Sequence, residues 1–246
     1  MNLDVTLLVG TCDRYHMLWK YFIILADRYF EPECRRMFVS ENTKVPSETY
    51  ETHLPGSLNW SDRIISALND IDTEYIFLLL DDYLLREKLT TERVSRYIEF
   101  LKKVDGNKMM IAPYDNKSAY EVEVKLHDDR YFKLTPYSNY QTAIMPSVIK
   151  TEWLKEVLTP DKSIHEVEIG GTNDIKGKDN KIYLEEQEFP GIAPGIVRKG
   201  GLLISEWKDV FTIERLVDDF PVKKETIIKR DSIENIERLV LNEDNR

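Results

Sequence analysis

The sequence is poor in the features that hold small secreted domains together and in those that bind polyanions. Only two of its 246 residues are cysteines, Cys12 and Cys34, which is too few for a disulfide scaffold and leaves no zinc-site spacing. Its 34 basic residues are outnumbered by 44 acidic ones, which gives a net charge of −10. Nonspecific nucleic-acid binding depends on an excess of Lys and Arg, so we expect no nucleic-acid partner. We expect a cytoplasmic protein with reduced thiols.

Long hydrophobic runs and glycine-centred motifs are also missing. The most apolar run, Tyr75–Leu80, is far shorter than the roughly 20 residues that span a bilayer, and Asp4 stands where a secretory signal would be basic. The chain has no Gly-x-Gly-x-x-Gly motif, phosphate-binding loop or Gly-x-Ser-x-Gly motif. These absences argue against dinucleotide oxidoreductases, ATPases and serine hydrolases. The four histidines show no paired metal-ligand spacing.

The sequence does contain alternating strand-like and helix-like segments. With 42% hydrophobic residues the chain can form a full core. Short runs of Val, Leu and Ile predict strands at Leu3–Val9, Arg36–Val39, Tyr75–Leu80 and Met109–Ala112. Apolar residues at helical spacing predict helices at Tyr15–Phe30, Ser61–Ile71 and Thr90–Lys103. This order predicts an α/β fold with a mostly parallel central sheet flanked by helices.

The second half of the chain has a different pattern. Alternating residues predict a small antiparallel ribbon over Ala119–Thr135. Three further elements are expected: a strand at Ala143–Met145, a helix over Ser147–Leu158 and a mobile loop over Gly170–Asn180. The C-terminal tail is expected to end in a short helix. No repeat or long linker divides the chain, so residues 1–246 are expected to form a single domain.

Polar residues follow several predicted strands, at the edge where parallel α/β sheets bind ligands. They are Thr11–Arg14, Ser40–Asn42 and Asp81–Asp82. Two adjacent carboxylates repel each other unless a cation neutralises them, and their oxygen atoms suit Mg²⁺ or Mn²⁺. Such an ion keeps several waters and completes its shell with substrate phosphates. The alternative is that these acids only mark the end of a strand.

The stretch from Leu58 to Tyr83 resembles the central part of GT-A fold glycosyltransferases, the family-2-like enzymes of bacterial surface polysaccharide synthesis. In both, a helix leads into a hydrophobic strand that ends in acids, here Leu80-Asp81-Asp82. The family's Asp-x-Asp motif has an acid where this chain has Leu80. The resemblance implies a GT-A-like fold and a Mn²⁺ or Mg²⁺ cofactor held by Asp82 and Asp81. By analogy with the last acid of the motif, Asp82 is the favoured direct ligand.

Further residues are similar to the donor site of that family, because they follow the strands or lie on the helix that faces them. The resemblance implies that the donor is bound by Thr11, Asp13, Arg14 and Glu41 near the nucleoside, and by Arg63 and Asp81 near the diphosphate. The later stretch Arg198–Gly201 resembles a basic loop of the family and adds Lys199 at the diphosphate, with a plain turn as the alternative. For each residue taken alone, a capped turn or a solvated surface is the alternative.

The segment Ser163–Gly171 resembles the part of the family that carries the catalytic base, with His165 in place of a Trp. Matching the spacing assigns the base to Glu168, with Glu166 as second choice. The chemistry needs such a group, since the acceptor hydroxyl must lose its proton as it attacks. Tyr137–Ala143 resembles the acceptor-binding region. The alternatives are an exposed helical turn and a surface loop with incidental tyrosines.

Together these matches imply a metal-dependent, inverting glycosyltransferase that moves a sugar from a nucleotide donor, a UDP-sugar first of all, to a glycan or lipid-linked acceptor. The donor half would extend to about Tyr83, and residues 84–246 would bind the acceptor and end in a helical tail. Basic pairs at Lys223-Lys224 and Lys229-Arg230 would allow peripheral contact with the inner face of the cell membrane. A sugar nucleotidyltransferase and a non-catalytic glycan-binding or assembly module are the alternative functions.

Overall fold

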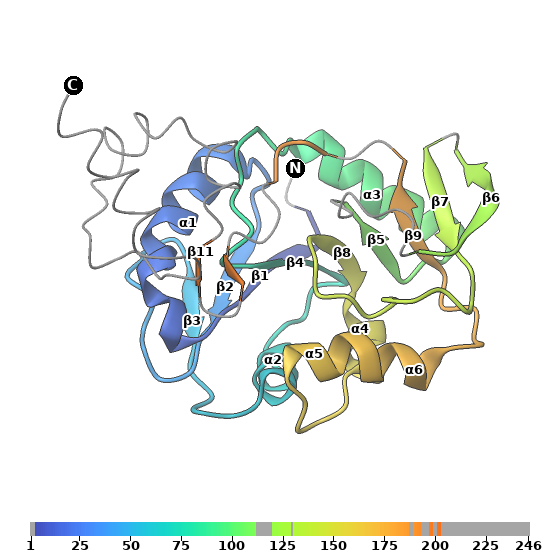
Figure 1. The fold of residues 1–246 in the computed structure, drawn as a ribbon. Helices are drawn as coiled ribbons and strands as arrows, with labels where there is room; N and C mark the ends of the chain where they lie inside the picture. The colour runs from blue at the N-terminus through green and yellow to red at the C-terminus, as the bar shows by residue number, and fades with distance from the viewer. Residues whose placement is uncertain are drawn as a thin grey trace, which may run out of the picture.

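The structure is a computed structural model that describes residues 3–111, 120–128, 130–186, 189–192, 197–198 and 201–202. It consists of a large central sheet with helices on both faces (Figure 1). Lys199, the two basic pairs of the tail and the expected final helix lie outside the described residues. Among the helices that are described, none is both long enough and apolar enough to cross a bilayer.

The first half of the chain confirms the predicted strands and helices to within a few residues. Its strands are β1 (Val5–Gly10), β2 (Arg35–Val39), β3 (Glu51–His53), β4 (Tyr75–Leu80) and β5 (Lys108–Met110). Its helical elements are the 3-10 helix η1 (Asp13–Tyr15) and the α-helices α1 (His16–Tyr29), α2 (Trp60–Leu68) and α3 (Thr91–Val104). The short strand β3 was not expected, because it lies in a polar stretch with little hydrophobic alternation.

The second half departs further from the expectations. Its strands are β6 (Val122–His127), β7 (Tyr131–Leu134), β8 (Ser147–Lys150), β9 (Ile182–Glu185), β10 (Val197–Arg198) and β11 (Gly201–Leu202). Its helical elements are α4 (Thr151–Val157), α5 (Ile164–Glu166), the π-helix η3 (Val167–Gly171) and α6 (Thr172–Ile175). The antiparallel ribbon is confirmed by the pairing of β6 with β7. The expected strand at Ala143–Met145 is wrong, and residues 170–175 are helical rather than part of a loop.

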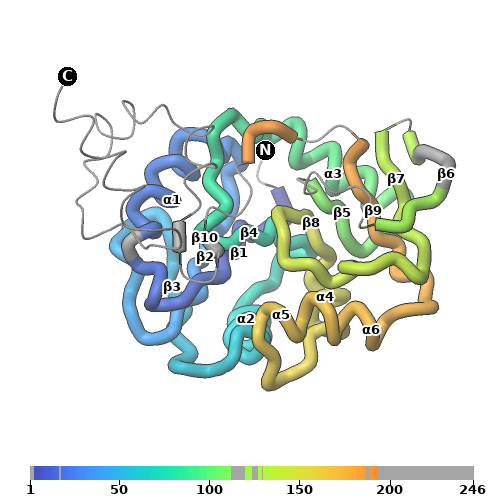
Figure 2. The backbone as a smooth tube through the Cα atoms, in the orientation of Figure 1, coloured from blue at the N-terminus to red at the C-terminus, as the bar shows by residue number. Residues whose placement is uncertain are grey.

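The central sheet is mixed, so the prediction of a mostly parallel sheet is wrong. Its nine strands follow the order β3-β2-β1-β4-β8-β5-β9-β7-β6. The pairs on one side, from β3 to β4, are all parallel. Beyond β4, only β5 and β9 are parallel, and the other described pairs of this sheet are antiparallel. The tube in Figure 2 shows the early, blue strands on one side of the molecule and the later, green strands on the other.

The reversal of direction comes from β8, which lies between β4 and β5 and is antiparallel to both. The sequence prediction extended a helix back to Ser147, whereas the helix α4 begins only at Thr151. The four residues of β8 include the β-branched pair Val148 and Ile149, which are fully buried in the sheet. Branched side chains suit a pleated, buried strand, and the pairing with two neighbours decides the conformation of this short segment.

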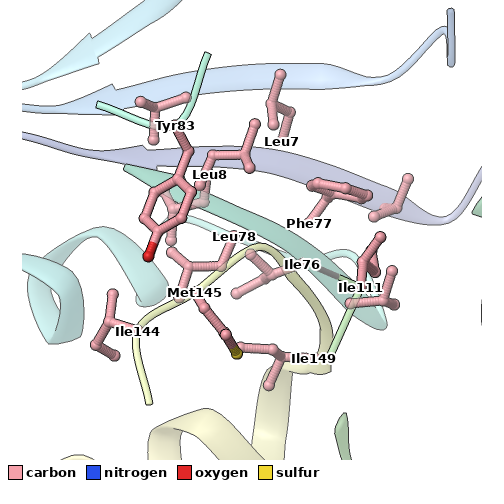
Figure 3. Close-up of a cluster of buried hydrophobic side chains, with 14 of the residues drawn as sticks. Leu7, Leu8, Ile76, Phe77, Leu78, Tyr83, Ile111, Ile144, Met145 and Ile149 are labelled. Atoms are coloured by element: carbon pink, nitrogen blue, oxygen red, sulfur yellow. The ribbon is translucent and has the colours of Figure 1, made fainter. Parts of the chain in front are cut away.

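Successive residues of β1 and β4 point to opposite faces of the sheet, and both faces are covered. On one face, Phe77 packs edge-on against Phe30 at the end of α1, with ring centroids 5.2 Å apart. On the other face, Ile76 and its register neighbour Ile149 of β8 are both buried. Figure 3 shows Phe77, Ile76 and Ile149 within one buried cluster that also contains Leu78. Strands covered on both faces read as continuous apolar runs, which explains why β1 and β4 were recognisable in the sequence.

The start of α3 supplies a test of the fold. Thr90 is its N-cap, and the Thr90 Oγ1 accepts a hydrogen bond from the Arg93 N–H at 3.2 Å. We expect Thr90→Ala to lower the free energy of unfolding by about 1 kcal/mol, because one helix N–H loses its partner. The measurement is urea denaturation. Thr91→Ala, one residue further on, is the matched control, and an equal loss in both variants would contradict the capping role.

Candidate active site

The ends of three neighbouring parallel strands bring most of the predicted donor residues to one edge of the sheet. Thr11 and Asp13 follow β1, Glu41 follows β2, and the two aspartates follow β4. Helix α2 contributes Arg63, which is only 6% exposed. The sequence prediction therefore grouped residues that the fold does bring to one edge, although the roles of these side chains differ in the structure.

Side chains of β4 alternate between the two faces of the sheet, and the Asp81 side chain lies on the buried face that α1 covers. It is 2% exposed, and its Oδ2 accepts hydrogen bonds from Thr11 Oγ1 and from Trp19 Nε1 of α1. Burial raises the pKa of the Asp81 carboxyl well above its ordinary value; the charge of Asp82 adds to this rise, and the two hydrogen bonds oppose it. The geometry therefore makes Asp81 an anchor between β4, β1 and α1. Of the two predicted metal ligands, Asp82 is the one with exposed surface.

Asp13 is engaged by the loop after β2. Its carboxylate accepts hydrogen bonds from the N–H groups of residues 41–43 and from Thr43 Oγ1, the last at 2.8 Å. In return, the Asp13 N–H donates to Glu41 Oε2 at 3.1 Å. Desolvation favours a higher pKa for Asp13, but the hydrogen bonds from Thr43 and the loop N–H groups outweigh it and lower the pKa. Asp13 thus shapes the edge of the sheet by tying β1 to the β2 loop.

Two buried donors on the first turn of α2 face this edge without a partner in the described part of the chain. They are Arg63 Nε and Trp60 Nε1. The other nitrogens of the Arg63 guanidinium are engaged, since Nη1 donates to the Thr11 carbonyl and Nη2 lies 3.9 Å from a Glu41 oxygen. A β-carbon at Gly10 would lie 3.3 Å from Trp60 Nε1, so glycine lets this indole sit against the end of β1. Buried donors that lack a partner favour a ligand that brings acceptor oxygens.

Glu168 lies on the π-helix η3, and its carboxylate is held by the backbone of a neighbouring loop. Its Oε1 accepts a hydrogen bond from the Ile144 N–H at 2.9 Å. Desolvation raises the pKa of Glu168 above its ordinary value, although the Ile144 N–H, Lys108 and His165 act against this rise. A partly exposed carboxylate of raised pKa is a stronger proton acceptor than an ordinary glutamate. One-turn π-helices occur frequently at functional sites.

The register of β8 brings the Ile144 loop toward the acids that follow β4. Leu78 lies opposite Ser147 in this antiparallel pair, so the residues before Ser147 continue along the end of β4. Figure 3 shows Ile144 in the same buried cluster as Leu78 and Tyr83, the latter from the turn after β4. The loop that orients Glu168 is therefore packed against the chain that carries Asp82.

The remaining predicted residues have plainer surroundings. Glu166 is exposed and forms a capping box with Ser163, in which each side chain binds the backbone N–H of the other residue. Arg14 is exposed. The tyrosines of the predicted acceptor region, which precede the loop that binds Glu168, remain accessible, with Tyr137 at 66% and Tyr140 at 41% exposure. These side chains have the exposure that stacking against a sugar ring requires.

The side chains at the end of β4 include the acids expected to bind a divalent ion. In the ranges that the structure describes, no three His, Cys, Asp or Glu side chains form a group that could hold a metal by themselves. Asp82 is partly exposed, and one carboxylate of this kind fits an ion that keeps its waters and takes phosphate oxygens from the substrate. The residues present therefore fit Mg²⁺ or Mn²⁺ bound together with a diphosphate rather than a closed protein cage.

Sequence reasoning missed Trp19 and Lys108. Trp19 belongs to the apolar face of α1 and gave no sign that its N–H would bind the Thr11 hydroxyl, at 2.7 Å, and Asp81. Lys108 is 1% exposed and contacts the loop 141–144, whose Ile144 N–H binds Glu168. A lysine beside the apolar pair Met109 and Met110 in a strand was the one available signal of a buried charge.

No protein-family model matches the sequence, and no curated protein matches it. Among solved structures, S. aureus TarS 1-349 in complex with UDP gives a TM-score of 0.54 at 11% identity, over 92% of this chain and 76% of that chain. The same protein in complex with UDP-GlcNAc gives 0.53 at 13% identity, over 83% of this chain and 61% of that chain.

A third structure, 2-C-methyl-D-erythritol 4-phosphate cytidylyltransferase from Thermus thermophilus, gives 0.49 at 12% identity, over 85% of this chain and 98% of that chain. This score is too low to weigh. The fold of this chain is similar to that of TarS. The similarity agrees with the expected nucleotide-diphospho-sugar transferase fold, and at these identities it speaks for the fold alone.

The hydrogen bonds between Asp13 and the loop after β2 can be tested through the pH dependence of stability. We expect Asp13→Ala to lower the free energy of unfolding at pH 7 by about 2 kcal/mol, because several loop N–H groups lose a charged acceptor. Since the folded pKa of Asp13 is lowered, its stabilisation is complete above the unfolded value of about 3.9 and is lost as the pH falls through the folded value. Wild type and variant should therefore converge below about pH 4.

The measurement is chemical denaturation at pH values from 7 to 3, with the exposed Asp72 changed to Ala as the control. A stability difference that stays constant with pH would contradict this role of Asp13.

Proposed function

We propose that this chain is a glycosyltransferase that moves a sugar from a nucleotide-diphosphate donor to a glycan or lipid-linked acceptor. The observation that carries the proposal is the packing of the loop 141–144, which binds Glu168, against the end of β4. Asp82 lies at that end, next to the edge of the sheet formed by β1 and β2. This arrangement supplies a candidate acid for an ion and a candidate base from two separate parts of the chain. The similar fold of TarS, seen with UDP and with UDP-GlcNAc, supports the proposal.

The donor would bind along the edge formed by β1, β2 and α2. Thr11, Glu41 and the exposed Arg14 are proposed to border the nucleoside, and Asp13 to hold the loop in place. The partnerless donors Arg63 Nε and Trp60 Nε1 are proposed to bind acceptor oxygens of the donor. A UDP-sugar is the first donor to test. Lys199 stays a prediction for the diphosphate.

Asp82 is the residue proposed to hold a Mn²⁺ or Mg²⁺ ion, directly or through water. When bound, the ion would neutralise charge on the diphosphate leaving group. Asp81 is proposed to position Asp82 rather than to bind the ion itself, because the hydrogen bonds that Asp81 accepts from Thr11 and Trp19 fix the end of β4. The protein thus contributes one accessible carboxylate and a rigid strand end.

Glu168 is proposed to act as the general base. Its carboxylate would take the proton of the acceptor hydroxyl while the hydroxyl oxygen attacks the anomeric carbon. The bond from that carbon to the diphosphate breaks as the new glycosidic bond forms, so the configuration inverts. The raised pKa of Glu168 suits this task, because a carboxylate of higher pKa accepts a proton more readily. Tyr137 and Tyr140 would line the acceptor.

Donor binding can be tested by thermal denaturation. We expect UDP together with Mn²⁺ to raise the melting temperature of the wild type, because a ligand that binds only the folded state stabilises it. Asp82→Asn is expected to abolish the metal-dependent part of this shift. Asp174→Asn, an exposed acid on α6, is the matched control and should leave the shift unchanged. No shift with any nucleoside diphosphate would count against a nucleotide-sugar enzyme.

The assignment of the base is tested by comparing two neighbouring glutamates. We expect Glu168→Gln to retain the thermal shift with UDP and Mn²⁺ but to lower sugar transfer by roughly 100-fold or more. Glu166→Gln should keep its activity, because glutamine also completes a capping box. Release of UDP from UDP-sugars is the readout.

Equal turnover in both variants would contradict the role of Glu168. Release of pyrophosphate in place of UDP would indicate a nucleotidyltransferase, and glycan binding without turnover would indicate a non-catalytic module.

A further inference from the structure

Lys108 is a buried cation that the proposed chemistry does not use. It lies on β5 at 1% exposure, and its register neighbours, Ile149 on β8 and Ile182 on β9, are uncharged. Its Nζ donates to the Ala143 carbonyl at 2.6 Å and to the Gln141 carbonyl at 3.3 Å. Burying a lysine is costly, and an apolar side chain of the same volume would often be as stable or more stable.

The two carbonyls belong to the loop that holds Glu168. Ile144, the residue after Ala143, donates its N–H to Glu168 Oε1 at 2.9 Å. Between the two carbonyls, Thr142 Oγ1 donates to the Val167 carbonyl of η3 at 2.7 Å. Residues 141–144 therefore contact Lys108 through the Gln141 and Ala143 carbonyls. The same segment contacts Glu168 and its helix through the Thr142 hydroxyl and the Ile144 N–H.

The same loop is held in a conformation that an isolated chain rarely adopts. Tyr140 has a φ of 56°, in the left-handed region, and its carbonyl accepts a hydrogen bond from the Ala143 N–H at 3.0 Å. For a residue with a large side chain this conformation persists only when surrounding contacts enforce it. The bonds from Lys108 to the Gln141 and Ala143 carbonyls are contacts of that kind.

Charge links the two residues as well. Burial lowers the pKa of Lys108 to about 7, and Glu168 is the acid that opposes this change. In the other direction, Lys108 and His165 are the cations that lower the pKa of Glu168 against its desolvation. His165 lies on the exposed helix α5, so Lys108 is the buried one of the two.

We propose that Lys108 is a positioning residue that orients the carboxylate of Glu168 and supports its charge through the loop 141–144. The proposal rests on the proposed function only for its catalytic consequence. The lysine touches no reacting group. It holds the loop, and the loop N–H holds the carboxylate. When Lys108 is protonated, its charge favours the ionised carboxylate that can accept a proton.

The test compares Lys108→Met, which keeps the length of the side chain but removes its charge and donors, with Lys155→Met on α4, where the lysine is partly exposed and pairs only with Glu152 among the described ion pairs. In Lys108→Met we expect the Ile144 amide to exchange roughly tenfold faster in hydrogen–deuterium exchange. We also expect the titration midpoint of the Glu168 carboxyl in carbon NMR, assigned with Glu168→Gln, to rise by about half a unit or more. The control should show neither change.

The catalytic consequence is measured on the same variants with the nucleotide sugar that the wild type turns over. Lys108→Met should lower kcat by roughly 10- to 100-fold, while the thermal shift with UDP and Mn²⁺ stays at the wild-type value. If the methionine variant does not fold, Lys108→Gln, which keeps one donor, takes its place. Unchanged Ile144 exchange together with an unchanged Glu168 titration would overturn the proposal. If the wild type turns over no nucleotide sugar, the proposed function fails, while these two measurements still decide the role of Lys108.

Discussion

The antiparallel insertion of β8 between β4 and β5 is the constraint on which the site depends. Because β8 runs against β4, the loop before β8 meets the end of β4 where the polar residues gather. A parallel strand in that position would have left this loop at the opposite edge of the sheet. The same insertion places β5 behind the loop, so that Lys108 reaches the Gln141 and Ala143 carbonyls. One strand reversal thus joins the donor-side acids to the candidate base.

The alternation of side chains along β4 gives the two adjacent aspartates, Asp81 and Asp82, different surroundings. Asp81 follows the face covered by α1, where Trp19 and Thr11 bind its carboxylate. Asp82 is left partly exposed at the strand end. The buried Asp81 carboxyl accepts two hydrogen bonds that stabilise the strand end. Its raised pKa favours the neutral form, which avoids the free-energy cost of burying a charge. A ligand can then reach only the second carboxylate, and a sequence motif of two equal acids becomes a structural residue and a candidate binding residue.

Local patterns predicted the elements that depend on local physics. The buried strands β1 and β4 were predicted from continuous apolar runs, and the N-cap residue Thr90 predicted the start of α3. The four residues of β8 could not be read in this way, since their conformation depends on pairing with strands distant in the sequence. The contact of Asp81 with Trp19 spans 62 positions and has no local signal. The order of residues along the chain grouped the donor-site candidates, but only the packing separated Asp81 from Asp82.

We propose that the end of β4 and the loop 141–144, which binds Glu168, form one site for a nucleotide diphosphate. The most direct measurement is anomalous scattering from Mn²⁺ in crystals grown with UDP. We expect the ion between the diphosphate and the carboxylate of Asp82, with the Glu168 carboxylate facing the bound diphosphate. A diphosphate bound elsewhere on the protein, or an ion without contact to Asp82 directly or through water, would contradict the account.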